Sequence, residues 1–221
     1  MYSFSTELVI TFGNGVKRFT LDSEVKEFHL SDNFVSIPSA PYHFYSINEG
    51  NIAAMDHHMQ NFVYSLKHSK EEPYSLRYIG SMIGDVHRTI TYGGIYLYPI
   101  DKKRPHGKLR VLYECAPLAM IVEQAGGEVT TGMYKGEITR LLDIEPKRIH
   151  ETCPIVVACT RDMTKLRESY NEGYLSVVSA YASWGLSVCM CVCLYVCVYV
   201  CMYVCTCSCG VSVDCVCVTS Y

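Results

Sequence analysis

The sequence lacks a strong excess of charge of either sign. Its 221 residues carry 19 Lys and Arg against 22 Asp and Glu, a formal net charge of −3 at pH 7. This balance argues against a general nucleic-acid binder and against a protein that binds acidic membranes through its overall charge. It leaves room for a local basic site, because residues 102–110 read KKRPHGKLR.

Cysteine is scarce over most of the chain. Only Cys115, Cys153 and Cys159 lie before residue 186, and the other ten of the 13 cysteines lie between Cys189 and Cys217. A disulfide framework would need a more even spread, so we expect the first part to be a reduced intracellular domain. Residues 1–8 show no basic segment followed by an apolar one, so they predict no signal peptide, and we expect a cytoplasmic protein.

Charged residues are almost absent near the end of the chain, where residues 187–221 contain a single one, Asp214. The apolar residues 186–206 are about as long as a membrane span, but no basic residues flank them. Cys-x-Cys runs suit soft metals, although metal-binding tails avoid valine and tyrosine. Translation of a thymine–guanine repeat explains the composition best. We therefore interpret residues 176–221 as a Cys/Val/Tyr-rich low-complexity tail and a membrane anchor as the weaker alternative.

The region before the tail begins with short strands. Residues 6–12 and 16–21 alternate as strands do, and Asn14-Gly15 between them predicts a type I′ hairpin turn. A third strand is predicted near residues 28–30, and a fourth over residues 42–47. These strands precede the first helical pattern.

Helices and strands then alternate. Apolar residues at helical spacing predict a helix over residues 55–68, with Met59, Phe62, Val63 and Leu66 on one face. Further helices are expected at 80–92, at 117–125 with Pro117 in its first turn, and at 161–172; strands are expected at 95–99, 108–113 and 154–159. This alternation predicts a layered α/β domain over residues 1–175.

Groups that suit a phosphate ester lie between residues 48 and 114. Arg77 can bind phosphate with two parallel hydrogen bonds, and Tyr78 and Tyr98 can donate to phosphate without adding charge. Lys108 and Arg110 share one side of the strand predicted there. Glu114 joins them if that strand continues, either as an ion-pair partner or as a metal ligand.

Each group taken alone has an ordinary structural interpretation. A single basic residue is usually a solvated surface charge, and a single tyrosine usually packs half-buried. Glu114 fits a salt bridge with Arg110, and Asp85 with Arg88 fits a pair on one helix. His87 and His106 have no metal-ligand spacing and are interpreted as structural or surface residues.

Four segments in order resemble the C-terminal half of fructose-1,6-bisphosphatase: residues 45–51 (YSINEGN), 77–82 (RYIGSM), 93–99 (GGIYLYP) and 108–115 (KLRVLYEC). The similarity extends from about residue 6 to about residue 170. It implies an α/β fold of the sugar-phosphatase type, a layered sandwich of mixed sheets and helices, present here as its C-terminal half only.

The resemblance also implies roles for particular residues. Asn48, Tyr78 and Tyr98 would hold the distal 6-phosphate of fructose 1,6-bisphosphate. Arg77 would reach that phosphate in a neighbouring subunit, which implies a homo-oligomer, a dimer or tetramer, with a shared site.

The remaining roles concern the sugar and the scissile 1-phosphate. Lys108 would contact the sugar ring oxygen and phosphate, and the backbone of Gly80, Ser81 and Met82 would line the sugar. Arg110 would lie near the reacting phosphate, and Glu114 would bind magnesium (or manganese). In such enzymes the metals polarise the phosphoryl group.

The sequence departs from the family at three places. Asn51 stands where the family has a tyrosine, and about five extra residues lie near Met133–Thr139 in a surface loop that should tolerate them. The aspartate-rich segment that supplies most metal ligands, and the AMP site, belong to an N-terminal half that these residues do not include. Glu114 alone cannot hold a pair of magnesium ions.

The implied activity is hydrolysis of the 1-phosphate of fructose 1,6-bisphosphate, in gluconeogenesis. We expect this chain to have little or no activity alone. Two alternatives stay open at this point. One is a non-catalytic chain that binds phosphosugar or joins an oligomer, and the other is a bisphosphatase for a seven-carbon sugar.

Overall fold

The computed structural model describes residues 5–70 and 72–170, together with 203–204 and 216–217. The chain divides into one compact unit over residues 1–169 and another over residues 170–221. Besides Tyr170, the described part of the second unit is a pair of short antiparallel strands, β12 (Tyr203–Val204) and β13 (Val216–Cys217). The other tail residues, on which the tail interpretation rests, lie outside the described residues. The boundary at residue 175 stays a prediction.

The chain enters the first unit through a three-stranded antiparallel sheet, β1 (Glu7–Thr11), β2 (Val16–Leu21) and β3 (Phe28–Asp32). The predicted strands are confirmed, but the predicted type I′ turn is wrong. The loop has four residues, from Phe12 to Gly15, and φ is positive at Gly13 and Gly15 but not at Asn14. The Thr11 hydroxyl accepts from the Gly13 amide (3.1 Å) and donates to the Gly15 carbonyl (2.7 Å), which closes this longer loop.

A mixed six-stranded sheet forms the centre of the domain, in the order β5-β4-β6-β11-β8-β9. Strands β5, β4 and β6 are parallel to one another, whereas β11 runs antiparallel to both β6 and β8. Its strands are β4 (Phe44–Ser46), β5 (Ser75–Leu76), β6 (Ile95–Tyr98), β8 (Glu128–Tyr134), β9 (Glu137–Arg140) and β11 (Ile155–Ala158). The central position of β11 explains its unbroken apolar sequence, because all four of its residues are buried.

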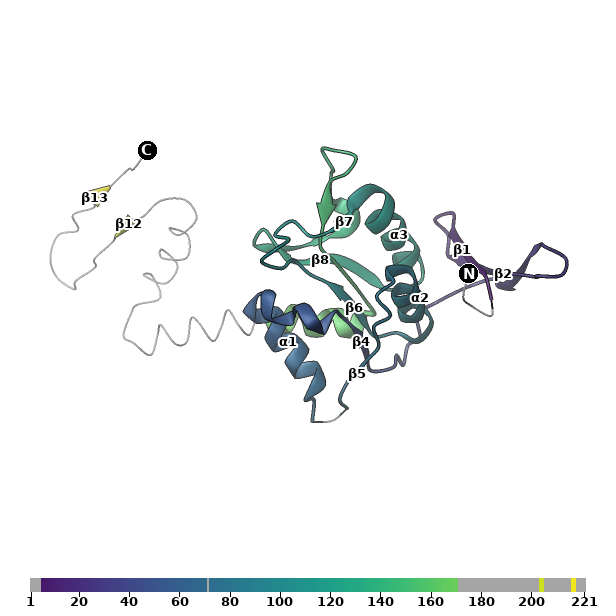
Figure 1. The fold of residues 1–221 in the computed structure, drawn as a ribbon, viewed down its shortest axis with the longest axis horizontal. Coiled ribbons are helices and arrows are strands. Elements are labelled where there is room, and N and C mark those ends of the chain that lie inside the picture. The colour runs from purple at the N-terminus through teal and green to yellow at the C-terminus, as the bar shows by residue number, and fades with distance from the viewer. Residues whose placement is uncertain (1–4, 71, 171–202, 205–215, 218–221) are drawn as a thin grey trace. The chain divides into compact units, whose positions relative to one another are not determined.

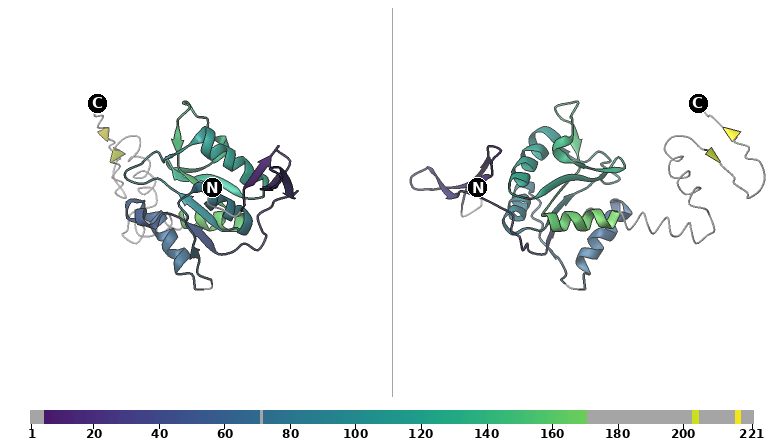
Figure 2. Two further views of the ribbon diagram at one scale, coloured as in Figure 1. Left: turned by 45° about the vertical axis from the view of Figure 1, so that its right-hand side comes forward. Right: turned by 180° about the vertical axis from the view of Figure 1, so that it is seen from behind.

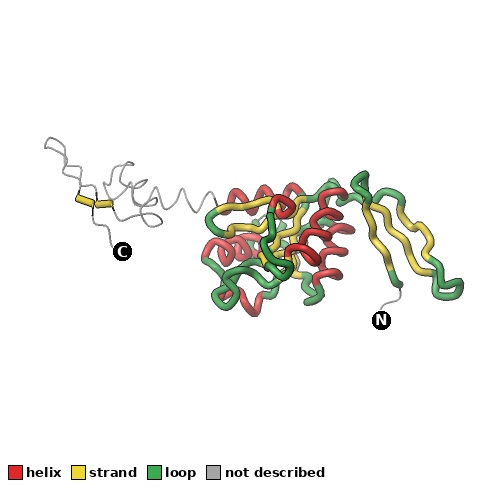
Figure 3. The backbone as a smooth tube through the Cα atoms, turned by 90° about the horizontal axis from the view of Figure 1, so that it is seen from above, coloured by secondary structure: helices red, strands yellow, loops and turns green. Residues whose placement is uncertain are grey.

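Helices cover both faces of this sheet (Figures 1 and 2). Helices α2 (Met82–Tyr92) and α3 (Ala116–Gln124) pack on one face through Val86, Ile90, Ala119 and Val122. Helix α1 (His57–Lys67) and a helix over residues 160–170 lie on the other face, where Met163 contacts Thr130 of β8. The helix–sheet–helix layers are also visible from above (Figure 3) and confirm the expected α/β sandwich.

The apolar face predicted for α1 is confirmed, since Met59, Phe62, Val63 and Leu66 are all buried. Two 3-10 turns, η1 (Glu49–Ala54) and η3 (Leu141–Asp143), complete the domain. Its cysteines Cys115, Cys153 and Cys159 are buried free thiols. Within the described ranges, no helix is both long enough and apolar enough to cross a membrane.

The strand predicted over residues 108–113 is wrong beyond Arg110. Strand β7 contains only Leu109–Arg110 and pairs with β10 (Thr152–Cys153). The chain then coils into a π-helical turn, η2 (Val111–Cys115), that leads directly into α3. Val111 and Cys115 are buried while Tyr113 between them is exposed, which fits a helical turn and not a strand, where these three residues would share one face.

Candidate functional site

The parallel strands β4 and β6 bring two of the expected phosphate-binding residues together. Ser46 lies opposite Tyr96 in their register, so Asn48, two residues on, comes level with Tyr98. Both side chains line a small hollow together with Asn51, Asp101 and other residues. The carboxyl ends of neighbouring parallel strands are a frequent place for a binding site.

This close approach of the two strands depends on Gly94, just before β6. Its φ is 92°, and a Cβ atom there would lie 2.3 Å from the Phe44 carbonyl oxygen. Any side chain at this position would therefore separate β4 from β6. The residue type at 94 thus controls the spacing of Asn48 and Tyr98.

The hollow is tight. It encloses about 10 Å³, the space of a single water molecule. The Asn48 side chain accepts from the Gly50 amide at 3.1 Å, which fixes it at the start of η1. Asn51, at the position where the sequence resemblance leads us to expect a tyrosine, lines the same hollow.

Tyr98 has a cationic partner that the sequence did not single out. The Arg104 guanidinium donates to the Tyr98 hydroxyl at 3.2 Å. The Asp101 carboxylate accepts from the Lys103 and Arg104 amides, both at 2.8 Å, and so fixes the loop that carries Arg104. The basic run at 102–110 was the only signal in the sequence for this contact.

Tyr78 lies half-buried beside Tyr98 and packs against the core. Burial raises the pKa of the Tyr78 phenol, and the neighbouring Tyr98 and Asp85 raise that pKa further. A raised pKa keeps the hydroxyl protonated at neutral pH, so that it can donate to an anion.

The loop from Arg77 to Gly80, which carries Tyr78, is held by Asp85 of α2. The Asp85 side chain is fully buried and accepts from the Ile79 amide (3.1 Å) and the Gly80 amide (3.2 Å). Arg88 contacts Asp85 at 2.6 Å and also donates to Ser46 Oγ and to the Arg77 carbonyl. The expected Asp85–Arg88 helix pair is therefore confirmed, and it also ties α2 to β4 and to this loop.

The other residues of the 77–82 motif differ in exposure. Arg77 is exposed, does not line the hollow, and places its guanidinium 5.1 Å from the Phe44 ring. Ser81 precedes α2 without capping it through its side chain, and Met82 packs against the core.

Lys108, Arg110 and Glu114 form a second group, at β7 and η2. Lys108 and Arg110 are exposed on either side of buried Leu109, as expected for one strand face. The Glu114 carboxylate accepts from the Arg110 amide at 2.7 Å and lies 3.7 Å from its guanidinium. Glu114 thus reaches Arg110 by the turn of η2 and not along a continued strand.

This second group does not fit a divalent-metal pair. The described residues contain no cluster of three or more His, Cys, Asp or Glu side chains that could hold a metal ion. Magnesium and manganese prefer several oxygen ligands, and Glu114 is engaged with Arg110.

The comparison with known families decides what these segments belong to. Residues 37–171 match the family model described as "Fructose-1-6-bisphosphatase, C-terminal domain". The chain belongs to the fructose-1,6-bisphosphatase family. The matched residues include all ten expected site residues, from Asn48 to Glu114.

Curated fructose-1,6-bisphosphatases are close in sequence. The chloroplastic protein of Pisum sativum is 46% identical over 170 residues, which cover 76% of this chain and 40% of that protein. The cytosolic protein of Oryza sativa subsp. indica is 46% identical over 172 residues, or 77% of this chain and 49% of that protein. The chain therefore spans less than half the length of these relatives.

Solved structures of fructose-1,6-bisphosphatase share the fold. The holo form from Leishmania major superposes with a TM-score of 0.71 at 41% identity, over 77% of this chain and 50% of that one. The T-state structure from the same organism gives 0.72 over 51% of its chain. Sequence and fold thus agree on the C-terminal portion of this family.

Proposed function

We propose that this chain binds fructose 1,6-bisphosphate through its 6-phosphate, as the substrate-holding portion of a fructose-1,6-bisphosphatase. The observation that supports this most is the meeting of Asn48 and Tyr98 in one hollow, with Arg104 on the Tyr98 hydroxyl. An amide, a phenol and a guanidinium supply several donors for phosphate oxygens. Tyr78, beside Tyr98, adds a protonated phenol.

A phosphate group is larger than the enclosed space of the hollow. We infer that it binds at the mouth and displaces the Arg104 guanidinium from Tyr98. Arg104 is exposed, so this movement costs little packing. The guanidinium then has a dianion as partner in place of a neutral hydroxyl, which makes a stronger hydrogen bond.

The remainder of the substrate would extend toward Lys108 and Arg110, with the backbone of Gly80, Ser81 and Met82 along the sugar. The exposed Arg77 would serve the 6-phosphate site of a second copy, so the active assembly would be a homo-oligomer, a dimer or a tetramer. The exposure of Arg77 and its absence from the lining of its own hollow support this arrangement.

Hydrolysis of the 1-phosphate would need metal ligands beyond the described residues. Glu114 would supply one carboxylate for magnesium or manganese, but no cluster that could complete the site lies within residues 5–70 and 72–170. We therefore expect the 221-residue chain to bind substrate with little or no turnover. The family activity would serve gluconeogenesis, in the cytoplasm as for the cytosolic relatives.

Isothermal titration calorimetry with the full chain tests the binding proposal. Fructose 1,6-bisphosphate and fructose 6-phosphate should bind, and fructose 1-phosphate should bind more weakly because it lacks the 6-phosphate. Asn48→Ala and Tyr98→Phe should each lower the affinity for fructose 6-phosphate by about 10- to 100-fold, since each removes a hydrogen bond to a charged group.

The matched control is Tyr64→Phe, which removes a phenol that is 63% exposed on α1, outside the hollow. Equal affinity for the 6-phosphate and the 1-phosphate, or no loss in Tyr98→Phe, would contradict the proposal. Phosphate release with magnesium at normal enzyme rates of about 1–1000 per second would overturn the expected inactivity. A seven-carbon ketose bisphosphate in the same titration separates the two substrate classes.

A further inference from the structure

A second hollow, open to solvent, lies between the β8–β9 hairpin and the loop before β10. It has a volume of about 790 Å³ and is lined by nine residues: His106, Tyr134, Lys135, Lys147, Arg148, Ile149, His150, Glu151 and Thr152. The volume falls in the usual range for small-ligand sites. None of these residues lines the hollow of Asn48 and Tyr98.

The hairpin forms one wall of this second hollow. Lys135 and Gly136 both have positive φ, 53° and 89°, which is the type I′ combination for a two-residue turn. The turn lies within residues 133–139, where the sequence predicts an addition to the family pattern. It places Tyr134 and Lys135 on the hollow, with the Lys135 amine 5.0 Å from the Tyr134 ring.

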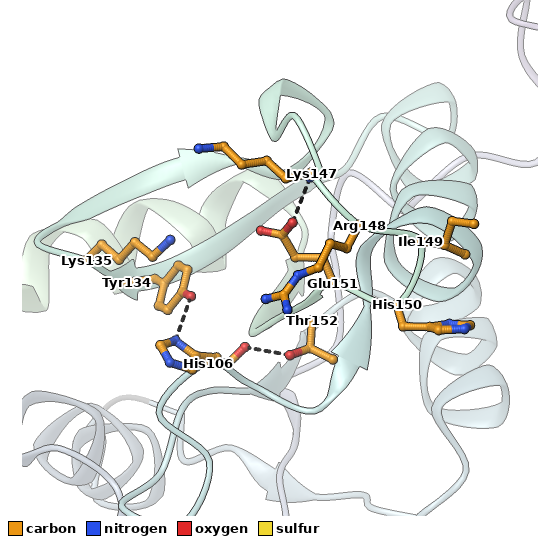
Figure 4. A pocket seen from close by; sticks show the side chains of 9 residues that line it. All are labelled: His106, Tyr134, Lys135, Lys147, Arg148, Ile149, His150, Glu151 and Thr152. Carbon is orange, nitrogen blue, oxygen red and sulfur yellow. Dashed lines mark hydrogen bonds between the residues drawn. The ribbon is translucent and has the colours of Figure 1, made fainter.

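The opposite wall is a tight turn over residues 147–151. The Glu151 carboxylate accepts from the Lys147 amide at 2.7 Å, and the Glu151 amide donates to the Arg148 carbonyl at 3.1 Å. The single carboxylate of the hollow therefore already braces this turn. Arg148 is left at the tip, exposed, with its guanidinium pointing toward Tyr134 and His106 (Figure 4).

The floor adds further hydrogen-bonding groups. His106 Nδ1 lies 3.3 Å from the Tyr134 hydroxyl, and the Thr152 hydroxyl donates to the His106 carbonyl at 3.2 Å. Figure 4 shows His150 turned away from these groups, and it contacts Tyr113 instead, at 2.9 Å. A hydroxyl and an imidazole thus lie between the two walls.

The charge of this hollow is opposite to that of the chain. The hollow has three basic side chains, Lys135, Lys147 and Arg148, against one carboxylate, in a protein of net charge −3. None of these three cations forms an ion pair with another residue of the part that the structure describes. A concave surface with unpaired cations concentrates positive potential and attracts anions.

We propose that this second hollow binds a small phosphate monoester. Arg148 offers a planar fork that matches two phosphate oxygens, and Lys135 offers a flexible ammonium from the facing wall. The Tyr134 hydroxyl and the His106 imidazole complete the shell from below. The second hollow is separate from the 6-phosphate site, so each of the two proposals can be tested without the other.

Phosphorus NMR and calorimetry on the full 221-residue chain test this proposal, with inorganic phosphate and glycerol 2-phosphate as probes. To isolate the second hollow, the titrations use a Tyr98→Phe background. Arg148→Gln and Lys135→Ala should each reduce affinity for both probes by about tenfold or more, because each removes a charge-assisted contact. Both residues are exposed, so folding should be unaffected, which circular dichroism would verify.

The matched control is Lys17→Ala, which removes an exposed lysine from β2, outside the hollow. Unchanged affinity in Arg148→Gln, or an equal loss in Lys17→Ala, would overturn the proposal by showing only non-specific attraction. A lower affinity for fructose 6-phosphate in Tyr98→Phe, with the affinity for glycerol 2-phosphate unchanged, would confirm two separate sites. Failure of the 6-phosphate site would leave the Arg148 comparison intact.

Discussion

The hollow of Asn48 and Tyr98 and the group of Lys108, Arg110 and Glu114 are built in different ways. The first is held by the fold, through the β4–β6 register, the Asp101 loop and the buried Asp85. In the second, the contacts described for Glu114 are with Arg110, and all three side chains lie partly or fully in solvent. One region is held in place by contacts among the described residues, and the other offers charges without a metal cluster among those residues.

The difference suggests that different parts of the family's sequence supply phosphate binding and metal binding. Residues that grip the distal end of a substrate can be preorganised within one domain, because phosphate recognition needs donors at fixed positions. A metal pair needs several carboxylates, and these can come from distant segments. We therefore expect the proposed substrate binding to be retained in this chain even where hydrolysis is not.

The largest expected effect comes from breaking the support of the first region. In Asp85→Ala, Arg88 and the Ile79 and Gly80 amides lose a buried partner. We expect the free energy of unfolding to fall by about 3–5 kcal/mol, as for removal of one member of a buried pair. Urea denaturation followed by circular dichroism measures this loss.

The control for Asp85 is Asp143→Ala, which breaks another Asp–Arg pair of the same spacing. Its partner Arg140 is at 2.7 Å, but the two side chains are 58% and 52% exposed. The loss should be less than about 1 kcal/mol. Similar losses at the two positions would show that Asp85 does not support the 77–80 loop.

The next effect concerns alkaline pH. Burial raises the pKa of Tyr96, which is 2% exposed and lies close to Tyr78, far above the ordinary value. Because the folded state holds the Tyr96 proton more tightly than the unfolded state, the free energy of unfolding is unaffected by this tyrosine below about pH 10, the unfolded pKa. Above that pH the unfolded state loses its proton first, and the stability of the fold decreases. The free energy of unfolding should fall by roughly 1.4 kcal/mol per pH unit for this tyrosine.

Urea midpoints at pH 8 and above pH 10 measure this pH dependence. Tyr96→Phe should make the fall less steep, because it removes the proton that the folded state retains. The same slope in Tyr96→Phe and in the unaltered protein would refute the assignment.

The smallest effect is expected at the second region. Glu114→Gln should change the free energy of unfolding by less than about 1 kcal/mol, because the Arg110–Glu114 pair is partly exposed. Millimolar magnesium should leave the melting temperature of the unaltered chain unchanged, since a ligand stabilises only the state that binds it. A rise in melting temperature that Glu114→Gln abolishes would show that a metal site is complete after all.

Most of the fold could be predicted from local patterns. The buried face of α1 and the buried strand β11 could both be predicted from the spacing of their apolar residues. The error at residues 111–113 arose because VLY suits a strand locally. The burial of Val111 and Cys115 with Tyr113 exposed between them shows a helical turn there instead, and this burial depends on distant segments.

The sequence motifs predicted which residues form the candidate site, but not the contacts that those residues make. Asn48, Tyr78 and Tyr98 could be selected as candidate phosphate ligands from residue chemistry and family resemblance, and that role stays a prediction. The Arg104 contact could not, because its loop closes through Asp101 by interactions that leave no periodic pattern. For the same reason the sequence did not predict that Asp85 holds the loop from Arg77 to Gly80, because only its burial distinguishes it from an acidic residue on a helix surface.

Gly94 carries a consequence for how this chain can vary. Its backbone excludes a methyl group against the Phe44 carbonyl, so the position admits one amino acid out of twenty. Even alanine there would act as a wedge, moving Asn48 away from Tyr98 while leaving every polar side chain of the hollow chemically intact. Such a substitution would abolish the proposed recognition of the sugar phosphate through geometry alone, at a residue that does not line the hollow.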